Sequence, residues 1–403
     1  MNVKHKVFGG VLLVAGTTIG AGMLALPIVT GLAGFVPTVF LFIVYWFYMT
    51  YTALLLLEVN LCLGEEINLI SMAKKTLGKS GEIAAWITYL FLLYLLVTAY
   101  LAEGGPIVAD FFNLLFGTAI PAWVGAIPLL LGFGFIVYEG TQVVDIVNRW
   151  LMVGLVVGYG AIVMLLIPHI DENYLARIEW KPVLLAIPLV ATSFGYHVII
   201  PTLTTYLHQN VRYLVKVVVI GSLIPLTVYI IWEIVTLGVI PIEGSHGIVQ
   251  GYQEGASGVR ILARTLGSPF IIAIAQFFSF CAIVTSFLGV TLSLSDFLTD
   301  GLNIKKTMKG RFILFALTFL PPLLFILTNP RAFVSALEFA GAFGVVILLG
   351  LLPPMMAWSR RYRKHMPSPF TVPGGKIGLS AAIVLSLLVI AVEISIKMYS
   401  FKG

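Results

Sequence analysis

The sequence predicts an all-helical integral membrane protein with eleven transmembrane helices. Hydrophobic residues occupy 59% and charged residues 10% of the 403 positions, whereas a soluble domain carries about 25% charged residues. Mean hydropathy is +1.03, and apolar runs of about 20 residues, the length needed to cross the hydrocarbon core, repeat along the chain. These runs leave no room for a soluble domain, so we expect residues 1–403 to form a single transmembrane domain.

The first apolar run follows Lys4 and Lys6 and is long enough to span the membrane. No small-residue cleavage site follows it, so we expect a first helix rather than a removed signal peptide. Gly104, Gly105 and Pro106 are expected to form an outer segment after the third helix. The eleven expected spans are Val7–Val29, Val36–Leu61, Ile83–Leu101, Ala122–Val137, Trp150–Ile167, Pro182–Tyr206, Val215–Ile240, Pro269–Phe297, Phe312–Leu327, Phe333–Trp358 and Ile377–Ile396.

The basic residues predict the orientation of these spans. A cytoplasmic N-terminus places 17 of the 24 basic residues on the cytoplasmic side and 7 on the other side, as the positive-inside rule requires. The C-terminus then lies outside. The positions of the basic residues in alternate loops account for the net charge of +6, so we expect no nucleic-acid partner. Cys62 and Cys281 fall on separate apolar segments and predict neither a disulfide nor a metal site.

The first span contains an unusual stretch, residues 16–22 (GTTIGAG). Each glycine costs about 1 kcal/mol relative to alanine in a helix, and freed backbone groups in lipid need a partner. We expect this break to line a polar cavity, with backbone N–H groups at Gly20 and Gly22 facing a carboxylate and hydroxyls added by Thr17 and Thr18. The alternative is close helix packing, because the glycines also have small-xxx-small spacing.

The sixth span repeats this pattern. Residues 192–197 (TSFGYH) contain two hydroxyls, an apolar residue and a glycine, and Pro201 follows as Pro27 follows the first break. Five crossings separate the two spans, so they have opposite orientations in the membrane. Interrupted helices at corresponding positions of two halves point to a transporter binding site.

Several motifs are similar to those of the bacterial aromatic amino acid permeases over nearly the whole chain. They are Thr17–Pro27 (TTIGAGMLALP), Leu55–Val59 (LLLEV), Thr192–Pro201 (TSFGYHVIIP), Gly221–Pro225 with Trp232 and Thr236–Gly238, Thr285–Gly289 (TSFLG), and Phe319–Pro322 (FLPP).

The resemblance implies a leucine-transporter-type fold in a bacterial inner membrane. Its inverted five-helix repeats would be 7–168 and 182–358, with an eleventh helix at 377–398. It also implies proton-driven import of an aromatic amino acid, with tyrosine expected first, tryptophan or phenylalanine as alternatives, and no cofactor.

The sixth and third spans supply further candidate substrate contacts. Carbonyls around Ser193, Phe194 and Gly195 would hold the substrate ammonium, while Phe194 and Tyr196 would face its ring. Tyr94 and Thr98 share one helix face, and the resemblance implies that the third span borders the site. For each aromatic residue the alternative is packing or anchoring at the membrane interface.

Ionisable residues inside spans are costly, so each is a functional candidate. His197 titrates near neutral pH when unperturbed and can carry a proton, or can stay neutral and satisfy a free carbonyl. Glu58 can relay a proton or pair with a loop lysine near the cytoplasmic end. Glu233 lies deep enough to need a partner.

Thr285 and Ser286 in the eighth span fit a sodium site, because sodium takes oxygen ligands. Their hydroxyls can equally bond back to the helix. The fifth span has no lysine to replace sodium, so the sequence leaves proton and sodium coupling both open.

Two other classes of protein fit less well. A membrane enzyme would need a nucleophile with a base or a metal cluster, but His197 is the one histidine in an expected span interior. A channel would need a continuous polar lining, whereas a pair of breaks predicts one occluded site.

Overall fold

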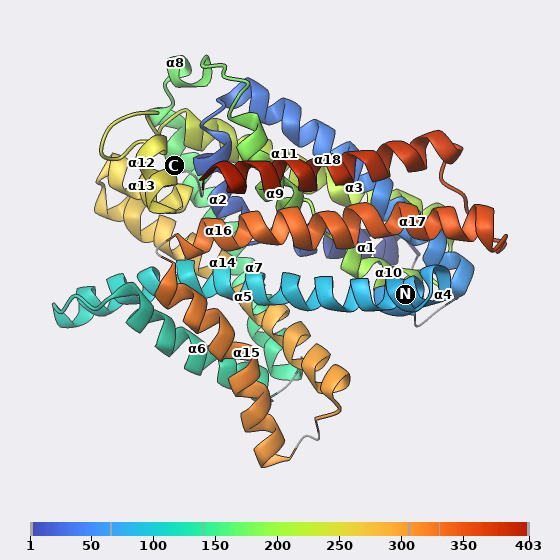
Figure 1. The fold of residues 1–403 in the computed structure, drawn as a ribbon. Coiled ribbons are helices and arrows are strands. Elements are labelled where there is room, and N and C mark those ends of the chain that lie inside the picture. The colour runs from blue at the N-terminus through green and yellow to red at the C-terminus, as the bar shows by residue number, and fades with distance from the viewer. Residues whose placement is uncertain (1–2, 65–66, 140, 305–306, 330, 401–403) are drawn as a thin grey trace.

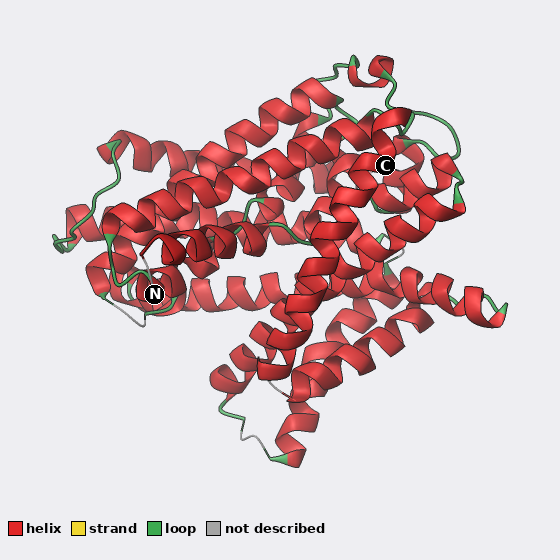
Figure 2. Ribbon diagram, turned by 180° about the vertical axis from the view of Figure 1, so that it is seen from behind, coloured by secondary structure: helices red, strands yellow, loops and turns green. Residues whose placement is uncertain are grey.

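The computed structural model describes residues 3–64, 67–139, 141–304, 307–329 and 331–400. Within these ranges the regular structure is helical (Figures 1 and 2). Nine of the described helices are long and apolar enough to cross a membrane, or ten with the bent pair α1–α2 counted as one span. The expected all-helical membrane fold is confirmed. The count of eleven stays a prediction, because the apolar part of α6, Ala122–Val137, is a shorter helix.

The described elements have the following bounds. In chain order they are α1 (Val3–Thr18), α2 (Gly22–Thr30), α3 (Phe35–Leu63), α4 (Leu69–Leu77), α5 (Lys79–Phe116), α6 (Ala122–Glu139), α7 (Thr141–Leu166), η1 (Ile167–His169), α8 (Glu172–Leu175), α9 (Val183–Ser193), η2 (His197–Ile199), α10 (Ile200–Tyr206), α11 (Val211–Leu237), α12 (Ile248–Glu254), α13 (Gly258–Leu266), α14 (Pro269–Leu302), α15 (Met308–Thr328), α16 (Ala332–Phe339), η3 (Ala340–Leu351), α17 (Leu352–Trp358), η4 (Ser359–Arg363) and α18 (Gly375–Ser400).

The two interrupted spans lie together inside the bundle. α2 packs against α9 and α11, and α9 packs in turn against η3. α14 contacts both α5 and α7, while α6 and α15 project to one side of the long α5 rod (Figure 1). This packing brings the breaks at residues 19–21 and 194–196 to neighbouring positions in the core.

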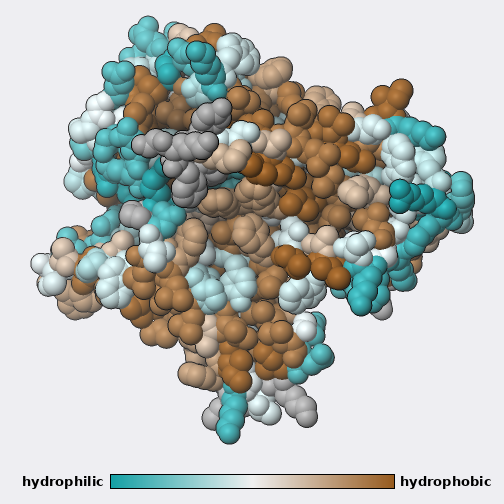
Figure 3. Space-filling view, viewed as in Figure 1, coloured by the Kyte–Doolittle hydropathy of each residue, from teal (hydrophilic) through white to brown (hydrophobic). Residues whose placement is uncertain are grey.

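Different helices lie at the two ends of the bundle. α1 begins at the end of the bundle that contains α4, whereas α18 ends at the opposite end, which contains α12 and α13 (Figures 1 and 2). Hydrophobic residues dominate the middle of the face in Figure 3, and hydrophilic ones gather toward its ends. An apolar belt between polar ends is the surface that a bilayer requires.

The third span is longer than expected. α5 continues through Gly104, Gly105 and Pro106 to Phe116, so the segment expected to lie outside the membrane is part of the same helix. The glycines serve close helix packing: a Cβ on Gly105 would lie 2.5 Å from the carbonyl oxygen of Ala122 at the start of α6. A break-prone sequence therefore remains helical because its small residues let α5 and α6 approach.

Candidate functional site

The first span is interrupted where the sequence predicts. α1 ends at Thr18 and α2 begins at Gly22, with a 56° bend between them. The N–H of Ala21 donates to Oγ of Ser286 over 3.1 Å. A Cβ on Gly20 would lie 2.5 Å from the same oxygen. Glycine at position 20 therefore gives α14 room to satisfy an N–H freed by the break.

The sixth span is interrupted opposite the first. α9 ends at Ser193, and helical structure resumes with η2 at His197. A Cβ on Gly22 would lie 3.3 Å from Oγ of Ser193. The two breaks are thus in direct contact, and Gly22 is small enough to allow it.

Tyr229 of α11 joins the two breaks. Its hydroxyl lies 2.7 Å from the carbonyl oxygen of Thr18 and 3.0 Å from that of Ser193. Both carbonyls belong to helix C-termini, which carry partial negative charge. The sequence analysis missed Tyr229, and the available signal was a tyrosine one turn before Glu233 in an apolar span.

The aromatic residues of the second break point in different directions. Phe194 packs edge-on against Tyr229, with ring centroids 5.4 Å apart, and against Phe42 at 5.9 Å. The Tyr196 hydroxyl instead donates to Thr50 of α3 over 3.4 Å. Phe194 is therefore the ring that borders the joined breaks.

Most predicted hydroxyls bond to their own helix, a pattern that leaves only their lone pairs for a ligand. Thr17 donates to Leu13, Thr18 to Val14, Thr98 to Tyr94 and Thr285 to Cys281, over 2.7, 2.7, 2.8 and 2.9 Å. Of the two residues expected to bind sodium, Ser286 contacts the first break, whereas the Thr285 hydroxyl donates to a backbone carbonyl of its own helix, α14.

Tyr94 does not turn its hydroxyl toward the breaks. It donates to the carbonyl oxygen of Leu317 in α15 over 2.9 Å. Pro321 lacks the N–H that would bond this carbonyl in a regular helix. Tyr100, two residues after Thr98 on α5, interacts with the Ser286 hydroxyl beside the first break.

Two ionisable residues are wholly buried beside the broken spans. Nε2 of His197 lies 2.8 Å from the Thr52 hydroxyl, and Oε1 of Glu233 lies 3.1 Å from the Thr30 hydroxyl at the end of α2. Nδ1 of His197 and Oε2 of Glu233 have no hydrogen-bond partner among the described residues. Both side chains therefore keep an open position for a proton or a polar ligand.

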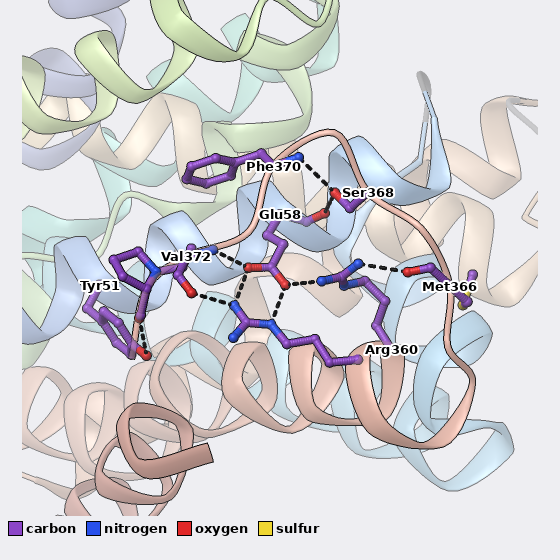
Figure 4. Close-up of polar contacts among 9 residues, drawn as sticks. Tyr51, Glu58, Arg360, Met366, Ser368, Phe370 and Val372 are labelled. Atoms are coloured by element: carbon purple, nitrogen blue, oxygen red, sulfur yellow. Dashed lines mark hydrogen bonds and ion pairs between the residues drawn. The ribbon is translucent and has the colours of Figure 1, made fainter. Parts of the chain in front are cut away.

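Glu58 lies elsewhere, at the end of the bundle that contains α4. Its carboxylate accepts from Nη2 of Arg360 at 2.5 Å, from Nε of Arg361 at 2.6 Å and from the N–H of Val372 at 2.7 Å (Figure 4). The Ser368 hydroxyl donates to its backbone carbonyl over 3.1 Å. Glu58 thus pairs with two arginines at the end of the tenth span, and not with a loop lysine.

These features define a membrane transporter built on two broken, adjoining helices. The fold is similar to that of a manganese transporter from Eremococcus coleocola, with a TM-score of 0.68 at 13% identity over 98% of this chain and 87% of that chain. The similarity supports the leucine-transporter-type fold.

The chain belongs to the tryptophan/tyrosine permease family, whose model matches residues 3–393. It is 34% identical to tyrosine-specific transport system 1 and 32% identical to tyrosine-specific transport system 2 of Haemophilus influenzae, over 98% of each chain. It is 33% identical to a tryptophan-specific transport protein of Pseudomonas aeruginosa, over 96% of this chain and 92% of that one. These relatives are transport proteins and not enzymes.

Proposed function

We propose that this permease imports an aromatic amino acid, tyrosine in the first place, by proton symport with alternating access. The proposal rests above all on the contact between the two breaks, which Tyr229 joins through the carbonyls of Thr18 and Ser193. Rocking of the broken spans against the surrounding helices would open this contact to each side of the membrane in turn.

The substrate zwitterion would bind between the breaks. Its carboxylate would face the start of α2 at Gly20 and Gly22, where a helix N-terminus favours negative charge. Its ammonium would face the carbonyl ends of α1 and α9, and Phe194 would contact its ring. The bound ammonium would then replace the Tyr229 hydroxyl as the donor to these carbonyl oxygens.

Tyrosine is proposed first because a tyrosine-specific relative is 34% identical to this chain, against 33% and 31% for two tryptophan-specific relatives. The tryptophan-specific relatives are about equally similar, so selectivity must come from the ring pocket. Competition by tryptophan and phenylalanine is therefore part of the test.

The coupling proton is proposed to bind Glu233. The Thr30 hydroxyl has one proton and lies 2.6 Å from the Leu26 carbonyl, closer than the 3.1 Å to Glu233. If the Thr30 hydroxyl donates its proton to the Leu26 carbonyl, it can only accept from Glu233. The contact with Glu233 is then a hydrogen bond only when Glu233 is protonated. A wholly buried carboxylate without a cation would also be costly. Thr30 ends α2, so loss of the proton would act directly on a broken span.

The location is proposed to be a bacterial inner membrane, with the N-terminus cytoplasmic and the C-terminus outside. α1 begins and α18 ends at opposite ends of the bundle (Figure 1), as an odd number of crossings requires. The repeats 7–168 and 182–358, with helix 377–398, remain part of this proposal.

Uptake by purified protein in liposomes tests the function. We expect saturable tyrosine uptake, counterflow with internal tyrosine, and accumulation driven by an imposed proton gradient. Accumulation that follows a sodium gradient instead would overturn the coupling and favour the Ser286 site. Failure of all three aromatic amino acids to enter would overturn the transport proposal.

A further inference from the structure

A cavity of about 280 Å³, lined by both apolar and charged side chains, lies between α5, α13 and α14. Two acids of α5, Glu103 and Asp110, and two bases of α13, Arg260 and Arg264, line it together. Its formal charge is therefore balanced, and its bases and acids come from different helices.

The central feature of this cavity is an ion pair. Nη2 of Arg260 lies 3.1 Å from Oε2 of Glu103, whose side chain is 2% exposed, whereas the Arg260 side chain is 26% exposed. The other charges have separate partners: Arg264 pairs with Glu254 at 2.8 Å, and Gln276 faces Asp110 at 3.5 Å. The buried Glu103 and the partly exposed Arg260 are thus the ion pair that a ligand in the cavity would meet.

The cavity shares two helices, α5 and α14, with the surroundings of the first break. Ser279 in its lining precedes Ser286 by seven residues, about 10 Å along α14. Glu103 follows Tyr100, which interacts with Ser286, by one turn of α5. A molecule leaving the cavity along α5 and α14 would therefore arrive at the first break.

The helix that carries Arg260 also covers the first span. A Cβ on Gly258 of α13 would lie 3.1 Å from the ring of Pro27 in α2. The ion pair consequently links α5 to α13, which packs on the broken first span. Breaking the ion pair would loosen the packing of α13 on that span.

We propose that this outer cavity is a second binding site for the transported amino acid, occupied before the central site. The substrate carboxylate pairs with Arg260 and its ammonium pairs with Glu103, so that a zwitterion replaces one protein ion pair with two. Ile107, Val259 and Ile272 supply an apolar wall for the ring. This inference rests on the proposed function.

The balanced charge favours a zwitterion over a simple anion or cation. An anion at Arg260 would leave the buried Glu103 without its paired cation, and a cation at Glu103 would displace Arg260. A zwitterion satisfies both residues at once. Amines or carboxylic acids that lack the second charge should therefore compete poorly.

Equilibrium binding of labelled tyrosine to the purified protein tests this inference. We expect wild-type protein to bind two molecules of tyrosine per chain. Gly20→Val fills the space beside Ser286 and should remove the central site, leaving one. In this background, Glu103→Gln should weaken the remaining binding at least tenfold.

Further variants guard against effects on folding. Glu103→Gln with Arg260→Met removes both charges without leaving either buried alone, and it should abolish the outer site. Glu82→Gln is the matched control, because Glu82 lies on the same helix in an ion pair with Lys74 at the other end of the bundle. It should leave both sites unchanged.

The outcomes separate this inference from the transport proposal. If wild-type protein transports tyrosine but binds one molecule, and Gly20→Val binds none, the outer site is overturned and the transport proposal stands. Residual binding to Gly20→Val that survives removal of both charges would also overturn it. If the wild type neither binds nor transports aromatic amino acids, the proposed function itself fails.

Discussion

The indole N–H of Trp232 donates to the carbonyl oxygen of Met23 over 3.0 Å. Pro27 lies four residues after Met23 and has no N–H, so this carbonyl lacks its helical partner. Trp232 and Met23 are both wholly buried, which makes an unpaired carbonyl costly here. α11 therefore supplies the hydrogen bond that Pro27 removes from α2.

Replacing Trp232 with phenylalanine should destabilise the protein by about 1–3 kcal/mol, because it leaves the Met23 carbonyl unsatisfied. Thermal unfolding of the purified protein in detergent measures this change. Trp46→Phe is the control: Trp46 donates to the Ser222 hydroxyl, so its loss leaves no buried carbonyl unpaired and should cost less. Equal losses for the two variants would refute the role of Met23.

Replacing Tyr229 with phenylalanine should reduce tyrosine uptake at least tenfold while the protein still reaches the membrane. The change removes the one hydroxyl that joins Thr18 and Ser193 but keeps the ring contact with Phe194. Tyr159→Phe also removes a hydroxyl from a helix contact, with Val228, yet lies outside the breaks and should retain uptake. Normal uptake by Tyr229→Phe would show that the bridge is dispensable.

Replacing Gly20 with alanine should weaken substrate binding, because the new methyl group would force Ser286 away from Ala21. Gly160→Ala serves as the comparison, since a Cβ there meets no atom within 4 Å, and alanine is the better helix former. Tyrosine binding measures both. The explanation fails if the two alanine variants bind equally well.

The sequence was sufficient to predict an all-helical membrane fold and the position of both breaks, because hydropathy and glycine content act locally. It could not identify what satisfies the breaks. Tyr229, Ser286 and Trp232 lie far from residues 16–22 in the chain, and only packing brings them together. One such gap has a local signal that the sequence analysis did not use: Pro27 has no N–H, so the Met23 carbonyl lacks its helical partner.

The ion-pair partners of Glu58 also could not be predicted from the sequence. Glu58 had a lysine-rich loop nearby in the chain, yet the fold brings Arg360 and Arg361 to it from about 300 residues away. Likewise, Gly104 and Gly105 were expected in an outer segment after the third helix, whereas in the structure α5 continues through them in contact with α6. Long-range packing decided each of these cases against the local signal.

Glu58→Gln should destabilise the protein by about 3–5 kcal/mol, because it leaves two buried guanidinium groups without their carboxylate. Asp145→Asn breaks an exposed ion pair with Arg149 and should cost at most about 1 kcal/mol. Denaturation in detergent compares the two. A cost for Glu58→Gln no larger than that of the exposed pair would argue against a structural role.

Glu233→Gln should separate transport from its driving force. Glutamine keeps the shape of the protonated acid and a donor for Thr30, but it cannot release a proton. We therefore expect the variant to exchange internal for external tyrosine at a rate near that of wild type, while an imposed proton gradient no longer drives accumulation. Thr30→Val, which removes the contact between Glu233 and α2 but leaves the acid, should retain a proton requirement and lose rate. If Glu233→Gln still accumulates tyrosine with the proton gradient, the coupling proton binds another residue. The residue to test is then His197, which is buried and whose Nδ1 has no hydrogen-bond partner in the described part of the chain.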